Sequence, residues 1–201
     1  MKNIMDEYVA FVKKYMDVRL TQGFIKNDLL NICIGMDRVL LEWTGNTYVG
    51  RRKDKETEQW YQKFFVSIHD FLKFCADNSN ELSEMERSIA EKMMYRGIVY
   101  RYLGKCDSKN IRKKEIVYPE YNDVFVSWSK SETNYYILSK LYGPRTWMKA
   151  EIKEPYFGID IHGFELWCQE WFGDSSFITR GEEKEVVFPT IKECVLEMCY
   201  K

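Results

Sequence analysis

Two glutamates, Glu183 and Glu185, stand two positions apart where a glycine-led segment runs into the apolar residues Val186, Val187 and Phe188. Successive side chains of a strand point to opposite faces, so a strand here places both carboxylates on one face. Like charges side by side at the entrance of a buried strand repel each other and lose hydration. The pair therefore indicates a candidate acid site, with a solvated acidic strand end as the structural alternative.

Two other predicted strands carry polar residues at positions where they could complete such a site. Arg96 stands beside Gly97 at the start of one, and Ser127 and Ser129 flank Trp128 in the other. A planar guanidinium holds phosphate groups through paired hydrogen bonds, and a glycine allows a close backbone approach. A serine hydroxyl can orient a carboxylate by hydrogen bonding. Taken singly, a surface salt bridge explains Arg96 and an ordinary strand position explains Ser127.

The composition favours a globular protein and argues against several kinds of site. The 201 residues fit one large domain or two small lobes, with 45% hydrophobic and 30% charged residues. The net charge of −1 gives no general attraction to nucleic acid or to anionic membranes. Two histidines and six scattered cysteines without a CxxC pair argue against a metal site, a disulfide framework or a histidine-based triad. No metal ligand set is predicted.

No apolar run is long enough to cross a membrane, and acidic residues interrupt the first segment where a signal peptide needs an apolar stretch. We therefore expect no membrane partner and a cytoplasmic location where the protein is made, with action in a host cell left open.

The pattern along the chain changes from helical to strand-like. Helical spacing of apolar residues predicts a helical first part, including a helix that carries Trp60 to Cys75 and one that starts at the capping box Ser83–Glu86. The second part predicts strands over 95–102, 124–129, 147–152, 183–188 and 191–200, a helix over 131–142, an extended piece over 156–161 and a short helix over 164–172. Helices followed mainly by strands indicate an α+β fold.

In chain order, Arg96, Ser127 and Glu185 give arginine, serine, glutamate. This resembles the arginine–serine–glutamate class of mono-ADP-ribosyltransferases, toxin-like enzymes that consume NAD. The resemblance covers about residues 80–201 and includes segments similar to the family's central strand (148–152) and last hairpin (185–189 with the closing strand). It implies a helical lobe over 1–90 and a two-sheet, NAD-binding core over 91–201, or one continuous domain.

The resemblance also implies roles. Arg96, Gly97, Ser127 and Ser129 would bind NAD, the co-substrate, and Ser127 would orient Glu185. Glu185 would stabilise an oxocarbenium-like state as nicotinamide leaves, which resembles the charge problem of glycosidases. Glu183 would position or deprotonate the acceptor. The acceptor would be a protein target with arginine as the favoured side chain, and nucleic acid is not expected.

The sequence departs from the family pattern at several positions. Trp128 replaces the threonine of a Ser-Thr-Ser motif, and alternation predicts that it packs away from Ser127. Arg180 stands where an aromatic residue for target recognition is expected, with Phe172 and Phe177 as substitutes, and Glu182 adds an acid. The alternatives are an NAD glycohydrolase on the same fold, a non-catalytic interaction module, and a phosphotransferase or nucleic-acid-modifying relative, which the near-neutral charge does not favour.

Overall fold

The computed structural model describes residues 33, 36, 37, 39, 40, 43, 55–82, 84–102, 124–133, 147–173 and 184–199. The chain divides into two compact units, one made of Met1–Lys92 with Gly163–Thr179 and the other of Met93–His162 with Arg180–Lys201. The expected division into a helical lobe over 1–90 and a core over 91–201 stays a prediction.

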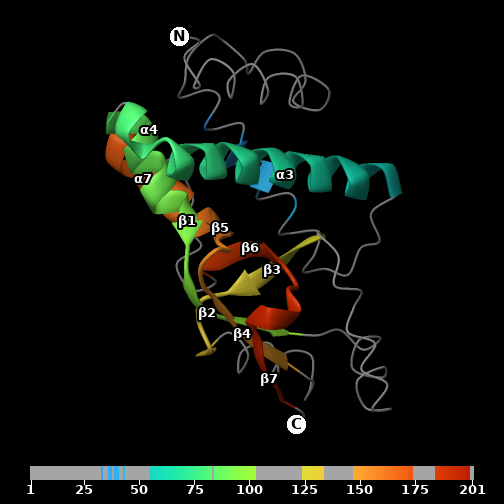
Figure 1. Cartoon of the computed structure of the whole chain (residues 1–201). Helices are drawn as coiled ribbons and strands as arrows, with labels where there is room; N and C mark the ends of the chain where they lie inside the picture. Colours follow the sequence, from blue (N-terminus) through green and yellow to red (C-terminus); the bar gives the residue numbers. More distant parts are fainter. Residues whose placement is uncertain are drawn as a thin grey trace. The chain divides into compact units, whose positions relative to one another are not determined.

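The first unit is helical in its described part. Its elements are α3 (Lys55–Asp77), η1 (Ser79–Glu81), α4 (Glu84–Met93) and most of α7 (Ile161–Phe172), which begins in the second unit (Figure 1). The predicted apolar spacing of α3 is confirmed, because the residues that repeat at helical intervals are buried: Tyr61, Phe64, Phe65, Ile68, Leu72 and Cys75. Trp43 packs edge-on against Phe65, with 4.6 Å between ring centroids.

The second unit is built on a seven-stranded sheet in which every described strand pair is antiparallel. Its strands are β1 (Met94–Tyr95), β2 (Gly97–Tyr102), β3 (Phe125–Ser129), β4 (Trp147–Ile152), β5 (Gly158–Asp160), β6 (Glu185–Pro189) and β7 (Val195–Cys199), with η2 (Lys192–Cys194) before β7. The order across the sheet is β1-β5-β6-β3-β2-β4-β7. The α+β class is confirmed, and so is the position of the last strand at a sheet edge.

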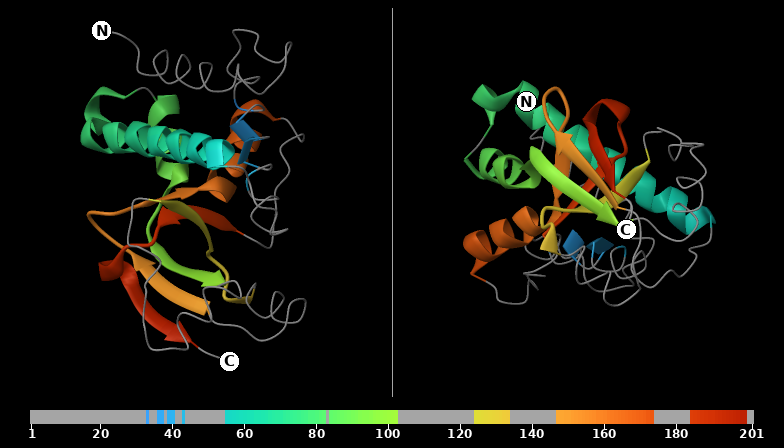
Figure 2. Two further views of the ribbon diagram at one scale, coloured as in Figure 1. Left: turned by 90° about the vertical axis from the view of Figure 1, so that its right-hand side faces the viewer. Right: turned by 90° about the horizontal axis from the view of Figure 1, so that it is seen from below.

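The predicted two-sheet core is wrong, because the strands form one strongly curled sheet (Figure 2). The strand that joins its halves is β2, which pairs with β3 through Tyr100 and with β4 along its whole length. Strands β1 and β2 follow each other in the chain, yet β1 lies at the sheet edge and β2 does not. The chain crosses between these places at Arg96, where the predicted continuous strand over 95–102 is interrupted.

The two faces of the sheet near β3 and β6 differ in character. On one face, Trp128 packs into a core with the apolar residues Val99, Met148, Ala150, Ile152, Val186, Phe188 and Cys194. The indole N–H of Trp128 donates a 3.0 Å hydrogen bond to the carbonyl oxygen of Phe188. Because side chains alternate along a strand, Ser127 and Glu185 point to the opposite face. The prediction that Trp128 packs away from Ser127 is confirmed.

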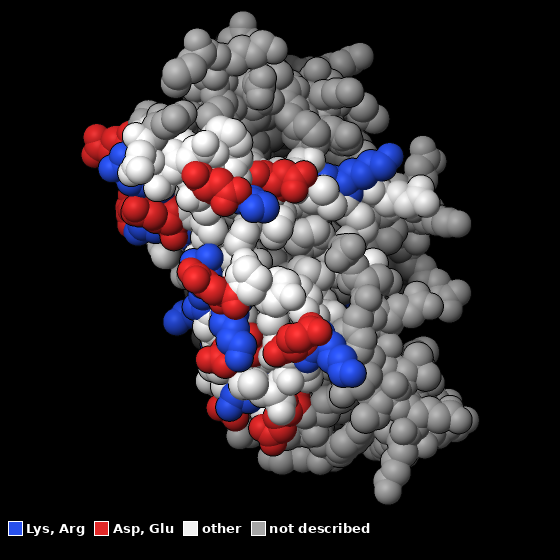
Figure 3. Space-filling view, viewed as in Figure 1, with Lys and Arg blue, Asp and Glu red and all other residues white. Residues whose placement is uncertain are grey.

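Within the described residues, no helix is both long and apolar enough to cross a membrane. On the face drawn in Figure 3, the described Lys and Arg side chains are interspersed with Asp and Glu side chains. This mixture agrees with the net charge of −1.

Candidate active site

Ser127 and Glu185 meet across two neighbouring strands of the second unit. The Ser127 hydroxyl donates a hydrogen bond to Oε1 of Glu185, although the residues are 58 positions apart in the chain. The antiparallel register pairs Ser129 with Glu185 and Ser127 with Val187, so the bonded side chains are diagonal neighbours on one face. Two of the residues predicted for the site are therefore brought into direct contact.

The surroundings of Glu185 favour this contact. The residue is only 8% exposed, and Val186 and Val187 beside it are fully buried. A carboxylate removed from water is costly unless hydrogen bonds compensate it. A hydroxyl that donates to an ionised oxygen makes one of the stronger protein hydrogen bonds and fixes the direction of the acid. The pair is thus a buried, oriented carboxylate at the first position of β6.

Arg96 lies in the crossing between β1 and β2 and contacts a different segment. Its Nε donates to the carbonyl oxygen of Tyr156 at 3.2 Å, and its Nη1 lies 3.6 Å from Oε1 of Glu154. Its side chain is 43% exposed and that of Glu154 is 81% exposed, so the ion pair is a weak one. The described contacts therefore connect Arg96 to the segment between β4 and β5, not to Ser127 or Glu185.

Gly97 makes this crossing possible. Its φ is +143°, in the region that side chains rarely adopt, and a Cβ added there would lie 2.8 Å from the Tyr95 hydroxyl. The glycine beside Arg96 is thus required by the backbone path. Its predicted part in NAD binding stays a prediction.

The remaining predicted site residues divide into one with a local role and one outside the described part. The Ser129 hydroxyl accepts from the N–H of Ser131 at 3.0 Å and lies 3.2 Å from its carbonyl oxygen, which closes the turn after β3. Glu183 lies outside the described residues, as do Glu182 and Arg180. The expected role of Glu183 toward an acceptor therefore stays a prediction.

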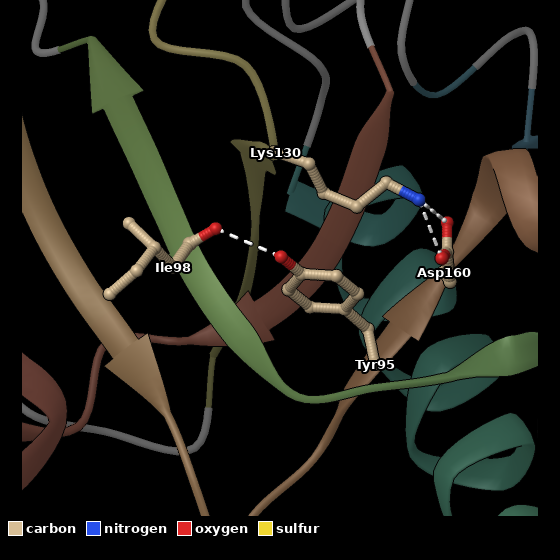
Figure 4. Close-up of polar contacts among 4 residues, drawn as sticks. All are labelled: Tyr95, Ile98, Lys130 and Asp160. Atoms are coloured by element: carbon tan, nitrogen blue, oxygen red, sulfur yellow. Dashed lines mark hydrogen bonds and ion pairs between the residues drawn. The ribbon is translucent and has the colours of Figure 1, made fainter.

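A second polar cluster, which the sequence analysis did not single out, lies at the same end of β3 and β6. Lys130 Nζ donates to both carboxylate oxygens of Asp160, at 2.9 and 2.6 Å, and lies 5.3 Å from the ring centre of Tyr95 (Figure 4). The Tyr95 hydroxyl donates to the carbonyl oxygen of Ile98 at 3.0 Å. A lysine directly after a polar strand end and an aspartate directly before a helix were the available signals. Their proximity depends on β5 and β3 both flanking β6.

This cluster also changes the acidity of its neighbours. Burial lowers the pKa of His162, as does the charge of Lys130, while Asp160 acts in the opposite direction and Lys184 lowers it further. Burial raises the pKa of the Tyr95 hydroxyl, and the Asp160 carboxylate and Tyr100 raise it further. At neutral pH the imidazole is therefore neutral and the phenol is protonated, which leaves the Tyr95 hydroxyl able to donate to Ile98.

The described residues contain no group of three or more His, Cys, Asp or Glu side chains that could hold a metal ion. The chemistry that the arrangement offers is that of an oriented carboxylate, able to accept a hydrogen bond or to stabilise a developing positive charge. This chain matches no protein-family model, no curated protein and no solved structure in comparisons with known proteins.

Proposed function

We propose that the protein is an NAD-dependent mono-ADP-ribosyltransferase that transfers ADP-ribose to a protein acceptor and releases nicotinamide. The observation that carries this proposal is the hydrogen bond from Ser127 to the buried carboxylate of Glu185. These are the serine and the glutamate of the arginine–serine–glutamate order, and both predicted strands that bear them are neighbours in the sheet.

In the proposed reaction, Glu185 acts on the nicotinamide ribose. Ser127 orients the Glu185 carboxylate, which would accept a hydrogen bond from the ribose 2′-hydroxyl. The bond between ribose C1′ and the nicotinamide nitrogen breaks, and its electron pair goes to the nitrogen, which becomes neutral. The ribose is left with oxocarbenium character, which a fixed carboxylate stabilises electrostatically. No general acid is required because the leaving group needs no proton.

Arg96 is proposed to bind the pyrophosphate of NAD. Its guanidinium is partly exposed, and its ion pair with Glu154 is weak enough for a phosphate to replace. The hydrogen bond from Nε to Tyr156 fixes the plane of the guanidinium, which leaves the Nη atoms for paired hydrogen bonds to phosphate oxygens. Gly97 and Ser129 are proposed to make further contacts to NAD.

The acceptor is proposed to be a protein side chain, with arginine favoured and Glu183 as the residue that positions it. The guanidinium of an acceptor arginine stays protonated throughout the physiological pH range, so the nitrogen that bonds to ribose C1′ needs a neighbouring carboxylate to take its proton. The interspersed charges on the face drawn in Figure 3 support a protein acceptor over a nucleic acid, which would favour an extended basic face.

The test measures nicotinamide release and transfer of labelled ADP-ribose in parallel, with NAD and a cell lysate as the source of acceptors. We expect Glu185→Gln to lose at least about a hundredfold in both, because the charge that stabilises the oxocarbenium is gone while the shape is kept. Glu193→Gln, an exposed glutamate of the same unit, is the matched control and should keep full activity. Nicotinamide release without any labelled acceptor would indicate a glycohydrolase instead. Absence of NAD consumption by the wild type would contradict the proposal.

A further inference from the structure

The start of β6 is fixed from its neighbour β3 through the main chain. Glu185 is the first residue of β6, and Lys184 before it has a φ of 42°, in the left-handed region. The N–H of Lys130, one residue beyond β3, donates a 3.0 Å hydrogen bond to the carbonyl oxygen of Lys184. Strand ends open more readily than strand centres, so this bond stabilises the point at which β6 begins.

The side chain of Lys130 extends the connection to the strand on the other side of β6. Its ammonium binds both oxygens of Asp160, the last residue of β5, and β5 and β3 are the two neighbours of β6. The two side chains are only 17% and 10% exposed, so this pair is shielded from water and from salt. An ion pair between the ends of β3 and β5 therefore spans the first residues of β6.

This ion pair lies on the face opposite to the Glu185 carboxylate. Asp160 is in register with Val186, which in turn is in register with Trp128, so these three residues share the core face. Alternation from Trp128 places Lys130 on that face as well, whereas Ser127 and Glu185 lie on the other. Lys130 consequently affects Glu185 through the backbone of Lys184, without touching its carboxylate.

Tyr95 connects the same cluster to the arginine segment. The Lys130 ammonium lies over its ring. Its hydroxyl donates a hydrogen bond to Ile98, so that the bond bridges the intervening residues Arg96 and Gly97 (Figure 4). A cation above an aromatic face is a favourable contact, and more so when it is shielded from water. The cluster is thus in contact with, or next to, each of the three segments that carry the arginine, the serine and the glutamate.

We propose that Lys130, Asp160 and Tyr95 form a positioning cluster that fixes the entry of β6 and so keeps the Glu185 carboxylate against Ser127. Its effect on turnover rests on the proposed function, whereas its effect on the position of Glu185 does not. Small displacements of a reacting group weaken transition-state contacts more than they weaken binding of the remote parts of a substrate. Loss of the cluster should therefore lower kcat more than it raises KM.

The test uses the double variant Lys130→Met/Asp160→Asn, which removes the ion pair without leaving one buried charge uncompensated. Lys130→Arg keeps the charge and serves as the conservative variant. Lys73→Met breaks an exposed lysine–aspartate pair on α3 and is the matched control. The first readout is the carboxyl carbon NMR signal of Glu185, referenced to its position in Ser127→Ala, where the hydrogen bond is absent. The second is kcat and KM for nicotinamide release.

In the double variant, we expect the Glu185 signal to move toward its position in Ser127→Ala. We expect kcat to fall at least about tenfold while KM for NAD changes by less than about threefold. Lys130→Arg and Lys73→Met should keep the wild-type signal and kcat.

A Glu185 signal that stays at the wild-type position in the folded double variant would overturn the inference. The inference would also be overturned if kcat fell only in proportion to the folded fraction while KM and the Glu185 signal stayed unchanged. If the wild type consumes no NAD, the proposed function fails, and the NMR signal alone decides whether the cluster positions Glu185. Should the double variant not fold, Lys130→Gln/Asp160→Asn provides the same comparison with a smaller change, because it also removes both charges but keeps a polar side chain at each position.

Discussion

Arg96 is proposed to bind NAD, and its contacts within the protein are weak. A substitution can therefore separate its effect on NAD binding from its effect on stability. Arg96→Lys keeps the positive charge but loses the two-pronged geometry that suits a pyrophosphate. We expect NAD binding to weaken by roughly tenfold by calorimetry, since paired hydrogen bonds become a single charged contact. The melting temperature without NAD should barely change, because the ion pair with Glu154 is exposed.

Arg87→Lys, which changes an exposed arginine of the first unit, is the control for Arg96→Lys and should bind NAD normally. A large drop in apo stability with unchanged NAD affinity would show instead that Arg96 is a structural salt-bridge residue.

Gly97 and Gly173 offer a comparison between backbone strain alone and strain with a steric clash. Both have positive φ, +143° and +61°, but only at Gly97 would a Cβ meet another atom, the Tyr95 hydroxyl at 2.8 Å. Alanine at a positive φ destabilises by about 1 kcal/mol or more, and displacement of Tyr95 should bring Gly97→Ala to about 2–3 kcal/mol. Urea unfolding of Gly97→Ala and Gly173→Ala measures the difference, and equal destabilisation would show that Tyr95 moves aside at little cost.

At the scale of elements, the strand pair β3–β6 carries the candidate site on one face and core packing on the other. Trp128 connects the two strands through its hydrogen bond to Phe188 and is 2% exposed. We expect Trp128→Phe to lower the free energy of unfolding by about 2–4 kcal/mol, from the lost volume and the unsatisfied carbonyl.

Trp171→Phe is the matched control for Trp128→Phe, because Trp171 also donates an indole hydrogen bond, to Ser88, but is 39% exposed. It should cost less than about 1 kcal/mol in a denaturant titration. Similar losses for the two variants would contradict the assignment of Trp128 to the core.

The local features of these strands were predictable from the sequence because they follow from alternation. The opposite orientations of Ser127 and Trp128 and the strand at 147–152 were both predicted, and each depends on residues close in the chain. The break at Arg96 was not predicted, since a run of β-forming residues does not reveal that Gly97 will adopt a positive φ.

Apart from the edge position of the last strand and the approach of Ser127 to Glu185, which the family resemblance implied, features that depend on which strands become neighbours could not be predicted. The ion pair between Lys130 and Asp160 exists because β5 and β3 both flank β6, an order that spacing along the chain does not specify. The single sheet in place of the expected two has the same origin, because it follows from β2 pairing on both sides. Sequence periodicity specifies the faces of strands more reliably than their neighbours.

At the scale of the whole molecule, the titration of the histidines should make the free energy of unfolding depend on pH. The chain has two histidines, His69 and His162, one in each compact unit. Burial lowers the pKa of both, and for His69 the nearby Asp70 opposes this effect only in part. The folded protein therefore prefers both imidazoles neutral, whereas the unfolded chain binds protons near the ordinary pKa of 6.5.

The sign of the effect follows from proton counts. As the pH falls below 6.5, the unfolded state takes up protons that the folded state does not, so the free energy of unfolding decreases until the lowered pKa of the folded state is reached. We expect urea midpoints to decrease from about pH 7.5 to about pH 5, and His69→Gln/His162→Gln to reduce the slope of this decrease.

Each single variant should remove part of the slope, because the histidines lie in different units and their effects should add. An unchanged slope in the double variant would assign the acid sensitivity to carboxylates instead.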